Sequence, residues 1–276
     1  MKVILAPTDF SKQSNNAVTY AAEVVNLTKS KLILLHVYSI PIMSAEAPVV
    51  MPVYIDMEKD CMNALNKQKR SLNRKYGTSL EIECVCKMGY AVEEIVKQCI
   101  AEKKVDLVVM GMHGAGYLSE KLIGSVTTAL IKRSDCPVLV INDKVRFKSL
   151  KKIVLAFDYE KNLNKTVLNP LKEFVKLFKS KIFVLNVINE DRKLPFFKNA
   201  VASVGIEHNL EEINHSYHFI QNEDVITGIN KFVATKKADM IVIVPRKHKF
   251  LNTIFRETNT KKMAFHTSVP LLALHE

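Results

Sequence analysis

The sequence contains no hydrophobic run approaching the roughly 20 residues that a membrane-spanning helix requires. Its longest apolar stretches, such as Leu107–Met110, have the length of a strand. The N-terminus has an apolar run of only Val3–Ala6 and no small-residue cleavage site, so it predicts a strand and not a signal peptide. We therefore expect a soluble chain that has no membrane partner and is not exported.

Cysteine is scarce, and its spacing suggests no pairing. The 5 cysteines are odd in number, lie in the first half of the chain and include no C-x-x-C spacing. The absence of a disulfide framework predicts reduced thiols and a cytoplasmic location. Cys84 and Cys86 fall on one face of an expected strand, Glu81–Cys86, where buried thiols are expected and not a redox pair. The remaining cysteines are Cys61, Cys99 and Cys136.

The basic excess is not concentrated in one segment. The formal net charge is +12, with 20 basic and 15 acidic residues in residues 1–150, and 20 and 13 in residues 151–276. A nucleic-acid footprint would be a clustered basic stripe with stacking aromatic residues, and neither is evident. The sequence therefore gives no indication of dedicated nucleic-acid binding.

The chain repeats itself, which indicates a tandem duplication. The second copy follows at an offset of 150 near its start and 133 near its end, and it lacks a counterpart to the proline-punctuated segment Ser39–Asp56, which we expect to be a long loop. A polar and basic stretch near residues 142–149 separates the copies, so the expected domains are 1–145 and 146–276. The matching segments are Lys2–Ala6 with Lys152–Ala156, Lys31–Val37 with Lys181–Val187, Asp106–Met110 with Asp239–Ile243, and Cys136–Val140 with Val269–Ala273.

Each copy alternates two kinds of hydrophobic pattern. Short runs of Val, Ile and Leu without alternation are typical of strands buried on both faces of a parallel sheet. Between them lie stripes at helical spacing, as at Val92, Ile95, Val96 and Cys99, and a similar one at Met57, Cys61, Leu65, Gln68 and Leu72. The predicted class is α/β, with two tandem open doubly wound, Rossmann-like domains, each a mainly parallel five-stranded sheet flanked by helices.

Glycine is sparse overall but clustered after one strand. Four of the 8 glycines, Gly111, Gly114, Gly116 and Gly124, follow Leu107–Met110 closely, and Ser125 then begins an expected short helix. Ligands of open α/β sheets bind beyond the carboxyl ends of the strands. Glycine allows backbone amides to approach phosphate oxygens, and a helix N-terminus favours an anion. The alternative interpretation is a loop with unusual dihedral angles.

The spacing Gly111-x2-Gly114-x9-Gly124-Ser125 resembles the nucleotide-binding signature of the universal stress protein family, in its ATP-binding branch. Pro7-Thr8-Asp9 after the first strand, Gly89, and Cys136-Pro137 before the fifth strand also match that family. The resemblance covers both copies and is stronger in residues 1–145.

The resemblance implies ATP, or a related adenine nucleotide, with Mg²⁺ coordinated mainly by phosphates and water. It implies no catalytic residue and no side-chain metal ligand. Asp9 could instead cap the following helix, alone or together with Ser11 or Ser14. The nucleotide-binding residues that it implies are Pro7, Thr8, Asp9, Val37, Met110, Gly111, Gly114, Gly124, Ser125 and Val126.

The second copy has no glycine from Val244 to its end, so we predict that it does not bind ATP in the family's way and has a structural or partner-binding function. Its basic run Arg246–Lys249 is either a solvated loop or an anion site. The resemblance further implies that Val138–Ile141 and Leu271–Leu274 pair within one chain as a pseudo-dimer, which covers two sheet edges. A homodimer of whole chains is left open.

Three functions are consistent with these observations. The leading hypothesis is a stress-response protein whose first domain binds the nucleotide and whose occupancy is read by an unknown protein partner. The second is a slow ATP hydrolase, although the sequence contains no G-x-x-x-x-G-K-[S/T] loop and no evident catalytic base. The third is a nucleotide-independent scaffold with partner binding on the second domain.

Overall fold

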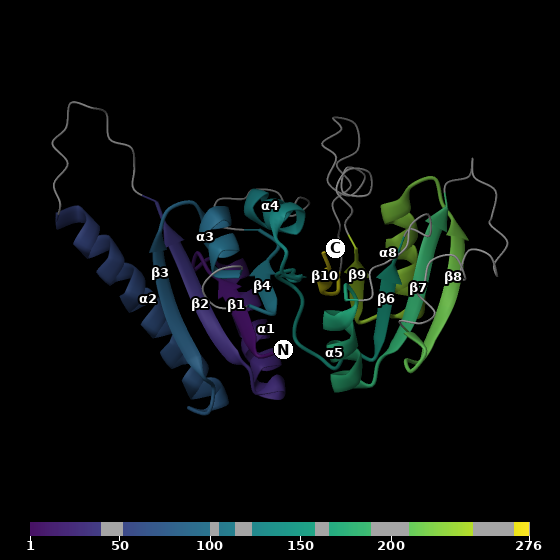
Figure 1. The fold of residues 1–276 in the computed structure, drawn as a ribbon, viewed down its shortest axis with the longest axis horizontal. Coiled ribbons are helices and arrows are strands. Elements are labelled where there is room, and N and C mark those ends of the chain that lie inside the picture. The colour runs from purple at the N-terminus through teal and green to yellow at the C-terminus, as the bar shows by residue number, and fades with distance from the viewer. Residues whose placement is uncertain are drawn as a thin grey trace.

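A computed structural model describes residues 1–39, 52–99, 105–113, 123–157, 166–188, 210–244 and 268–275. Within these ranges the strands form one ten-stranded sheet in the order β3-β2-β1-β4-β5-β10-β9-β6-β7-β8 (Figure 1). The strands are β1 (Val3–Pro7), β2 (Lys31–Tyr38), β3 (Ile82–Met88), β4 (Leu107–Gly111), β5 (Val138–Ile141), β6 (Lys152–Ala156), β7 (Lys181–Ile188), β8 (His215–Gln221), β9 (Met240–Ile243) and β10 (Leu271–Ala273).

Helices cover both faces of this sheet. Buried side chains of α1, α2 and α5 form one apolar layer, and those of α3, α4 and α8 form the other. Strand residues alternate between the layers, as Ile4 and Leu5 do in β1. The predicted doubly wound α/β class is confirmed. The helices are α1 (Lys12–Thr28), α2 (Pro52–Tyr76), α3 (Ala91–Lys97), α4 (Ser125–Arg133), α5 (Asn169–Phe178) and α8 (Val225–Lys236).

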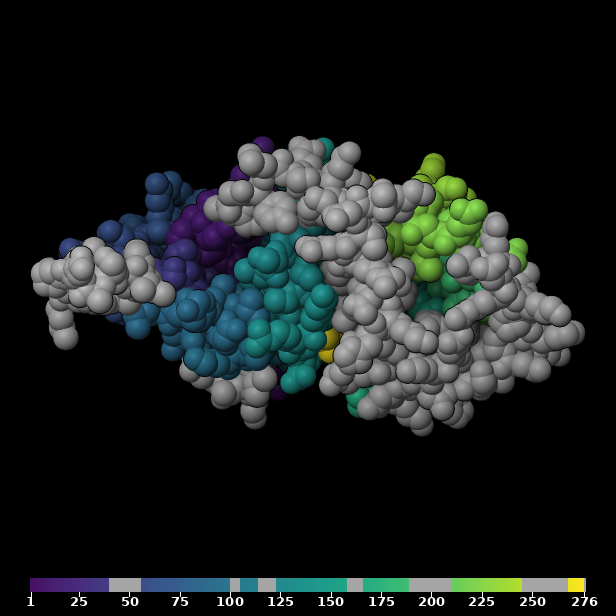
Figure 2. Space-filling view, turned by 90° about the horizontal axis from the view of Figure 1, so that it is seen from above, coloured from purple at the N-terminus to yellow at the C-terminus, as the bar shows by residue number. Residues whose placement is uncertain are grey.

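The two halves meet at the centre of the sheet. β5 and β10 pair antiparallel, with Leu272 opposite Leu139, whereas the other pairs among the described strands are parallel. This pairing within one chain confirms the expected pseudo-dimer. It covers two sheet edges and leaves β3 and β8 as the outer strands. In Figure 2 the first half lies in purple to teal on one side and β8 and α8 in green on the other.

The duplication is visible in repeated contacts. A carboxylate oxygen of Asp106 accepts the amides of Lys2 at 2.6 Å and Val3 at 2.9 Å. Its counterpart Asp239 accepts those of Lys151 and Lys152, both at 2.9 Å. These carboxylates fasten the starts of β1 and β6 to the loops before β4 and β9.

The joining segment is attached to the first half. The Asn16 side-chain amide of α1 donates to the carbonyls of Asn142 at 2.9 Å and Val145 at 3.0 Å. The Phe147 ring contacts the rings of Tyr20 and Phe178, with centroids 5.1 and 6.1 Å away. Phe147 therefore packs between α1 of one half and α5 of the other.

The prediction that Ser39–Asp56 forms a loop is partly wrong. Residues 40–51 lie outside the described ranges, but Pro52 already begins α2, so the last five residues of the expected loop are helical. Proline is favourable at the first helical position because its fixed φ suits the helix and its missing N–H would have no helical acceptor there. The apolar stripe expected at Cys61, Leu65 and Leu72 is buried against the sheet.

The expectation that every cysteine is an unpaired thiol is wrong. Cys61 of α2 and Cys86 of β3 form a disulfide, with their Cα atoms 6.3 Å apart. Period two had placed Cys84 and Cys86 on one face of the strand, and α2 covers that face with the stripe that contains Cys61. Cys84, Cys99 and Cys136 are free thiols. Among the described helices, none is long and apolar enough to cross a membrane.

Candidate functional site

A cavity of about 270 Å³ lies at the carboxyl ends of β1, β2 and β4, where the strand order of the first half reverses. This position is the usual ligand site of open α/β sheets, and the volume is close to the lower end for small-molecule sites. The cavity is lined by Pro7, Thr8, Asp9, Ser14, Leu35, Val37, Ala91, Ile95, Met110, Gly111, His113, Gly124, Ser125, Val126 and Thr127.

Nine of the ten residues singled out in the sequence line this one cavity, although they come from four separate segments. The tenth, Gly114, lies outside the described residues. The other six lining residues, Ser14, Leu35, Ala91, Ile95, His113 and Thr127, were not among these ten. A signal for Leu35 was available, because it lies two residues before Val37 and therefore on the same face of β2. Ala91 and Ile95 are likewise four apart on one face of α3.

The turn between β1 and α1 forms the polar wall of the cavity. The Thr8 side chain is 5% exposed, accepts the Phe10 amide at 3.1 Å and lies 3.2 Å from the Ser14 hydroxyl. Phe10 has φ of 63°, a conformation that non-glycine residues rarely adopt. The Thr8 hydroxyl and the Asn15 side chain, which donates to the Phe10 carbonyl at 2.9 Å, hold this turn.

The structure resolves the two interpretations of Asp9 in part. Ser11 is the N-cap of α1, and its hydroxyl accepts the Ser14 amide at 3.2 Å. Asp9 instead accepts the Ser11 amide at 3.0 Å and stays exposed at the cavity rim. Asp9 is therefore a turn residue and not the helix cap.

The N-terminus of α4 faces the cavity. Gly124 is the N-cap, and its own amide donates to the Met112 carbonyl at 2.8 Å, so this amide has an internal acceptor. Ser125 and Val126 occupy the first turn, where backbone amides have no acceptor within the helix. The Thr127 hydroxyl donates to the Gly111 carbonyl at 3.0 Å and fastens the helix to the end of β4. The first-turn amides give this end of the cavity a partial positive charge.

The backbone packs tightly around Gly111. A Cβ atom at this position would lie 3.2 Å from the backbone carbonyl carbon and oxygen of Gln13 in α1. A Cβ here would require the Gln13 backbone to shift by a few tenths of an ångström. Gly111 therefore allows the helix and the strand that enclose the cavity to lie close together. This is a reason for glycine at position 111 that is independent of the approach of a phosphate.

The opposite wall is apolar. Leu35, Val37, Ile95 and Met110 belong to, or pack against, the apolar layer under α3 and α4. The surfaces of α3 and α4 adjoin in Figure 2. Among the described lining residues Asp9 is the one carboxylate, and there is no Lys or Arg. The cavity thus combines an apolar region with a polar end formed by hydroxyls and backbone amides.

These features define an open α/β protein with a small-molecule site at the switch point of its first half. The model of the universal stress protein family matches residues 1–142, so the chain belongs to that family. Universal stress protein MJ0577 of Methanocaldococcus jannaschii is 33% identical over 158 residues, which cover 52% of this chain and 96% of that protein.

Solved structures show the same fold over the whole chain. A universal stress protein from Archaeoglobus fulgidus has a TM-score of 0.71 at 18% identity, covering 99% of this chain and 96% of its own. A universal stress protein from Pseudomonas aeruginosa has a TM-score of 0.64 at 14% identity, covering 100% and 93%. These structures therefore match the fold of both halves of the chain, whereas the curated sequence relative matches only about half of it.

Proposed function

We propose that this universal stress protein binds ATP, or a related adenine nucleotide, in the cavity of its first half and that occupancy acts as a signal. The observation that carries the proposal is the convergence of nine predicted residues on one cavity that faces the N-terminus of α4. The resemblance of the glycine spacing to the ATP-binding branch of the family supports the same conclusion.

The two ends of the cavity suit the two ends of a nucleotide. The apolar region at Leu35, Val37 and Ile95 offers a surface for a planar base. The first-turn amides of Ser125 and Val126 offer donors for phosphate oxygens. Met110 lines the cavity near the carboxyl end of β4, and there we propose that the ribose lies.

Mg²⁺ fits the site only as part of the bound nucleotide. No group of three or more His, Cys, Asp or Glu side chains that could hold a metal occurs in the described ranges. Asp9 is the carboxylate that the described lining offers. Because Mg²⁺ accepts phosphates and water as ligands, the chain needs to supply at most this one oxygen donor.

We further propose that the chain works as two units, residues 1–145 with the nucleotide site and residues 146–276 with a partner-binding or structural function, in the cytoplasm. The near-symmetric strand order about β5 and β10 supports this division. The glycine-free sequence after Val244 supports a second unit without the family's nucleotide mode. Its residues 245–267, including Arg246–Lys249, lie outside the described ranges.

The test begins with the protein purified without added nucleotide. Denaturation and chromatography identify and count any released nucleotide, and calorimetry then measures Mg-ATP binding to the emptied protein. Gly124→Val places a bulky side chain at the cavity end of α4, and because Gly124 has φ of −61° and ψ of 153°, valine can adopt its backbone conformation. Ala129→Val, on the same helix but away from the cavity, is the matched control.

We expect about one adenine nucleotide per chain, with binding lost in Gly124→Val and retained in Ala129→Val. Steady-state phosphate release that disappears in Gly124→Val would instead favour the hydrolase. If neither bound nucleotide nor a calorimetric response is found in the wild type, the proposal fails and a nucleotide-independent scaffold becomes the leading function.

A further inference from the structure

The disulfide between Cys61 and Cys86 joins the outermost helix to the outermost strand of the first half. β3 pairs with β2 on one side only, and α2 packs against both strands. Cys61 lies nine residues after the start of α2 and is 5% exposed, whereas Cys86 is half-buried. Cys86 is therefore the more exposed of the two bonded residues, and the bond fastens the edge of the sheet.

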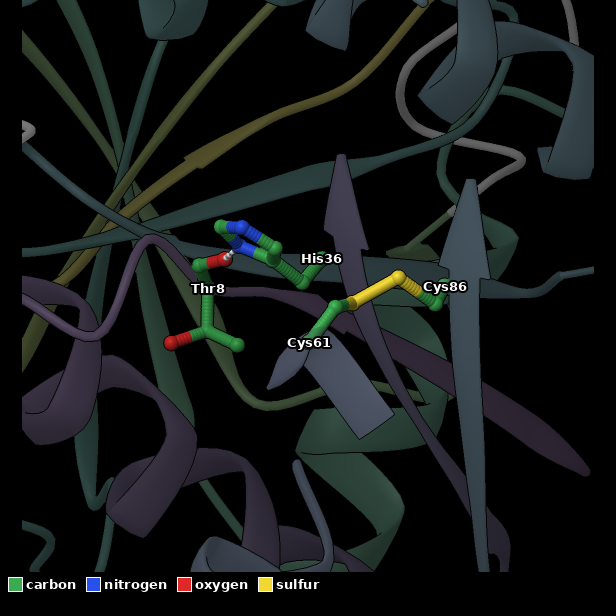
Figure 3. Close-up of a disulfide and its surroundings, with 4 residues drawn as sticks. All are labelled: Thr8, His36, Cys61 and Cys86. Atoms are coloured by element: carbon green, nitrogen blue, oxygen red, sulfur yellow. Dashed lines mark hydrogen bonds between the residues drawn. A yellow bond between two sulfur atoms is a disulfide. The ribbon is translucent and has the colours of Figure 1, made fainter. Parts of the chain in front are cut away.

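From Cys86 two short structural routes lead to the cavity. Cys86 is the register partner of His36 in β2, and the His36 Nδ1 atom forms a hydrogen bond of 2.7 Å with the Thr8 carbonyl oxygen. The His36 ring also packs on Phe10, with centroids 4.6 Å apart. Figure 3 shows His36 between Thr8 and the disulfide. Thr8 is part of the polar wall.

The second route follows the chain. β3 ends at Met88, the Gly89 amide donates to the Tyr38 carbonyl at 3.0 Å, and α3 begins at Ala91. Ala91 lines the cavity only five residues after Cys86. β3 is therefore connected to two sides of the cavity, to the polar wall through His36 and Thr8 and to the start of α3 through Ala91.

We propose that Cys61 and Cys86 form a thiol–disulfide exchange site whose redox state sets the nucleotide affinity of the cavity. The reacting partners are low-molecular-weight thiols of the glutathione class. The inference rests on the proposed nucleotide function, because affinity is its output. The closed bond holds β3, His36 and the start of α3 in the arrangement that forms the cavity, and the open bond releases the edge of the sheet.

The exchange is balanced in two steps. A thiolate attacks the sulfur of Cys86, the more exposed of the two residues, a mixed disulfide forms there, and the Cys61 sulfur leaves as a thiolate that takes up a proton. A second thiolate then attacks the small-thiol sulfur of the mixed disulfide, the two small thiols form their own disulfide, and Cys86 leaves as a thiolate that takes up a proton. Oxidation by the small disulfide runs the same steps in reverse.

The test compares the oxidised and reduced full-length protein. Alkylation and mass spectrometry should count three free thiols in the oxidised form and all five in the reduced form, because Cys84, Cys99 and Cys136 are free. Mg-ATP should bind the reduced protein at least about fivefold more weakly, the lower end of usual coupling between sites. Hydrogen exchange without nucleotide should be faster in residues 7–10 and 87–95 of the reduced protein.

Two variants separate the bond from its surroundings. The double variant Cys61→Ser/Cys86→Ser should behave as the reduced protein under either condition. Cys84→Ser is the matched control, because Cys84 lies on the same strand and face, is half-buried and is free. It should keep the full redox response.

Equal Mg-ATP affinity in both redox forms would overturn the switch while leaving the nucleotide proposal intact. If neither form binds the nucleotide, the proposed function fails. In that case equal hydrogen exchange of the two redox forms at residues 7–10 and 87–95 would also overturn the coupling between the disulfide and the cavity. Different exchange rates would support this coupling. A bond that stays closed in excess reduced glutathione would also overturn the proposal.

Discussion

Thr8 connects the end of β1 to the first turn of α1 with a single hydroxyl. Thr8→Val keeps the shape but leaves the Phe10 amide and the Ser14 hydroxyl without this partner. We expect the free energy of unfolding to fall by about 1–3 kcal/mol, the cost of a buried polar group left unsatisfied. Denaturant unfolding measures it. Thr19→Val on α1, where the hydroxyl donates only to a helical carbonyl, is the control and should change stability by less than about 0.5 kcal/mol. Equal losses in the two variants would contradict this account.

His275 makes the junction between the halves sensitive to acid. Its Nε2 atom forms a hydrogen bond of 2.8 Å with the Ile131 carbonyl of α4, and burial lowers the pKa of its side chain despite the opposing effects of this hydrogen bond and of Asp135. The unfolded chain, with a histidine pKa of about 6.5, therefore binds a proton first. Stability is retained above about pH 6.5 and falls as the pH drops below it.

We expect His275→Gln to reduce the loss of unfolding free energy between pH 7.5 and pH 5.5, because glutamine does not titrate. Part of the loss should remain, since burial also lowers the pKa of His218. Denaturant unfolding at the two pH values measures the difference. An unchanged loss in the variant would show that His275 does not contribute.

For single residues, the sequence predicted which ones line the cavity better than it predicted why each residue type stands there. The glycine spacing identified Gly111 and Gly124, but the close approach of Gln13 to Gly111 depends on how α1 lies across β4. Likewise the Gly124 amide bonds to Met112, which no spacing rule indicates. Such reasons depend on contacts between distant segments.

At the scale of elements, α8 approaches β7 unusually closely. A Cβ at Gly228 would lie 2.7 Å from a Val187 methyl carbon. We expect Gly228→Ala to destabilise the protein by about 1–3 kcal/mol through overpacking, although alanine is the better helix former by about 1 kcal/mol. Thermal or denaturant unfolding measures this. In a Val187→Ala background the same substitution should be neutral or stabilising, and a persistent loss there would refute steric overlap as the cause.

Single helices and strands could be predicted from the spacing of their hydrophobic residues, whereas the contacts between helices and strands could not. The stripe at Cys61, Leu65 and Leu72 indicated a helix, and period two placed Cys84 and Cys86 on one strand face. Neither pattern says which helix covers which strand. The disulfide between Cys61 and Cys86 needed that information, and the helical start at Pro52 was missed because three prolines suggested a loop.

For the whole molecule, the strand order predicts how the first half behaves alone. Without β10, the edge of β5 is uncovered, and a second copy of β5 can pair antiparallel with Leu139 opposite its own equivalent. We expect a fragment of residues 1–149 to form a concentration-dependent dimer in sedimentation experiments. The Methanocaldococcus relative, 96% of which aligns with about half of this chain, supports a unit of this size. A folded fragment that stays monomeric at tens of micromolar would contradict the prediction.

Because β5 and β10 belong to one chain, their antiparallel pairing does not depend on the protein concentration. Two separate chains joined by such strands would come apart as their concentration fell, but here one strand of the pair is tethered to the other at an effective concentration of about millimolar. A cell that makes more or less of this protein therefore changes the number of complete ten-stranded sheets and not the fraction that is assembled. Each copy of the chain carries one glycine-bearing half and one glycine-poor half in a fixed ratio, however few copies are present.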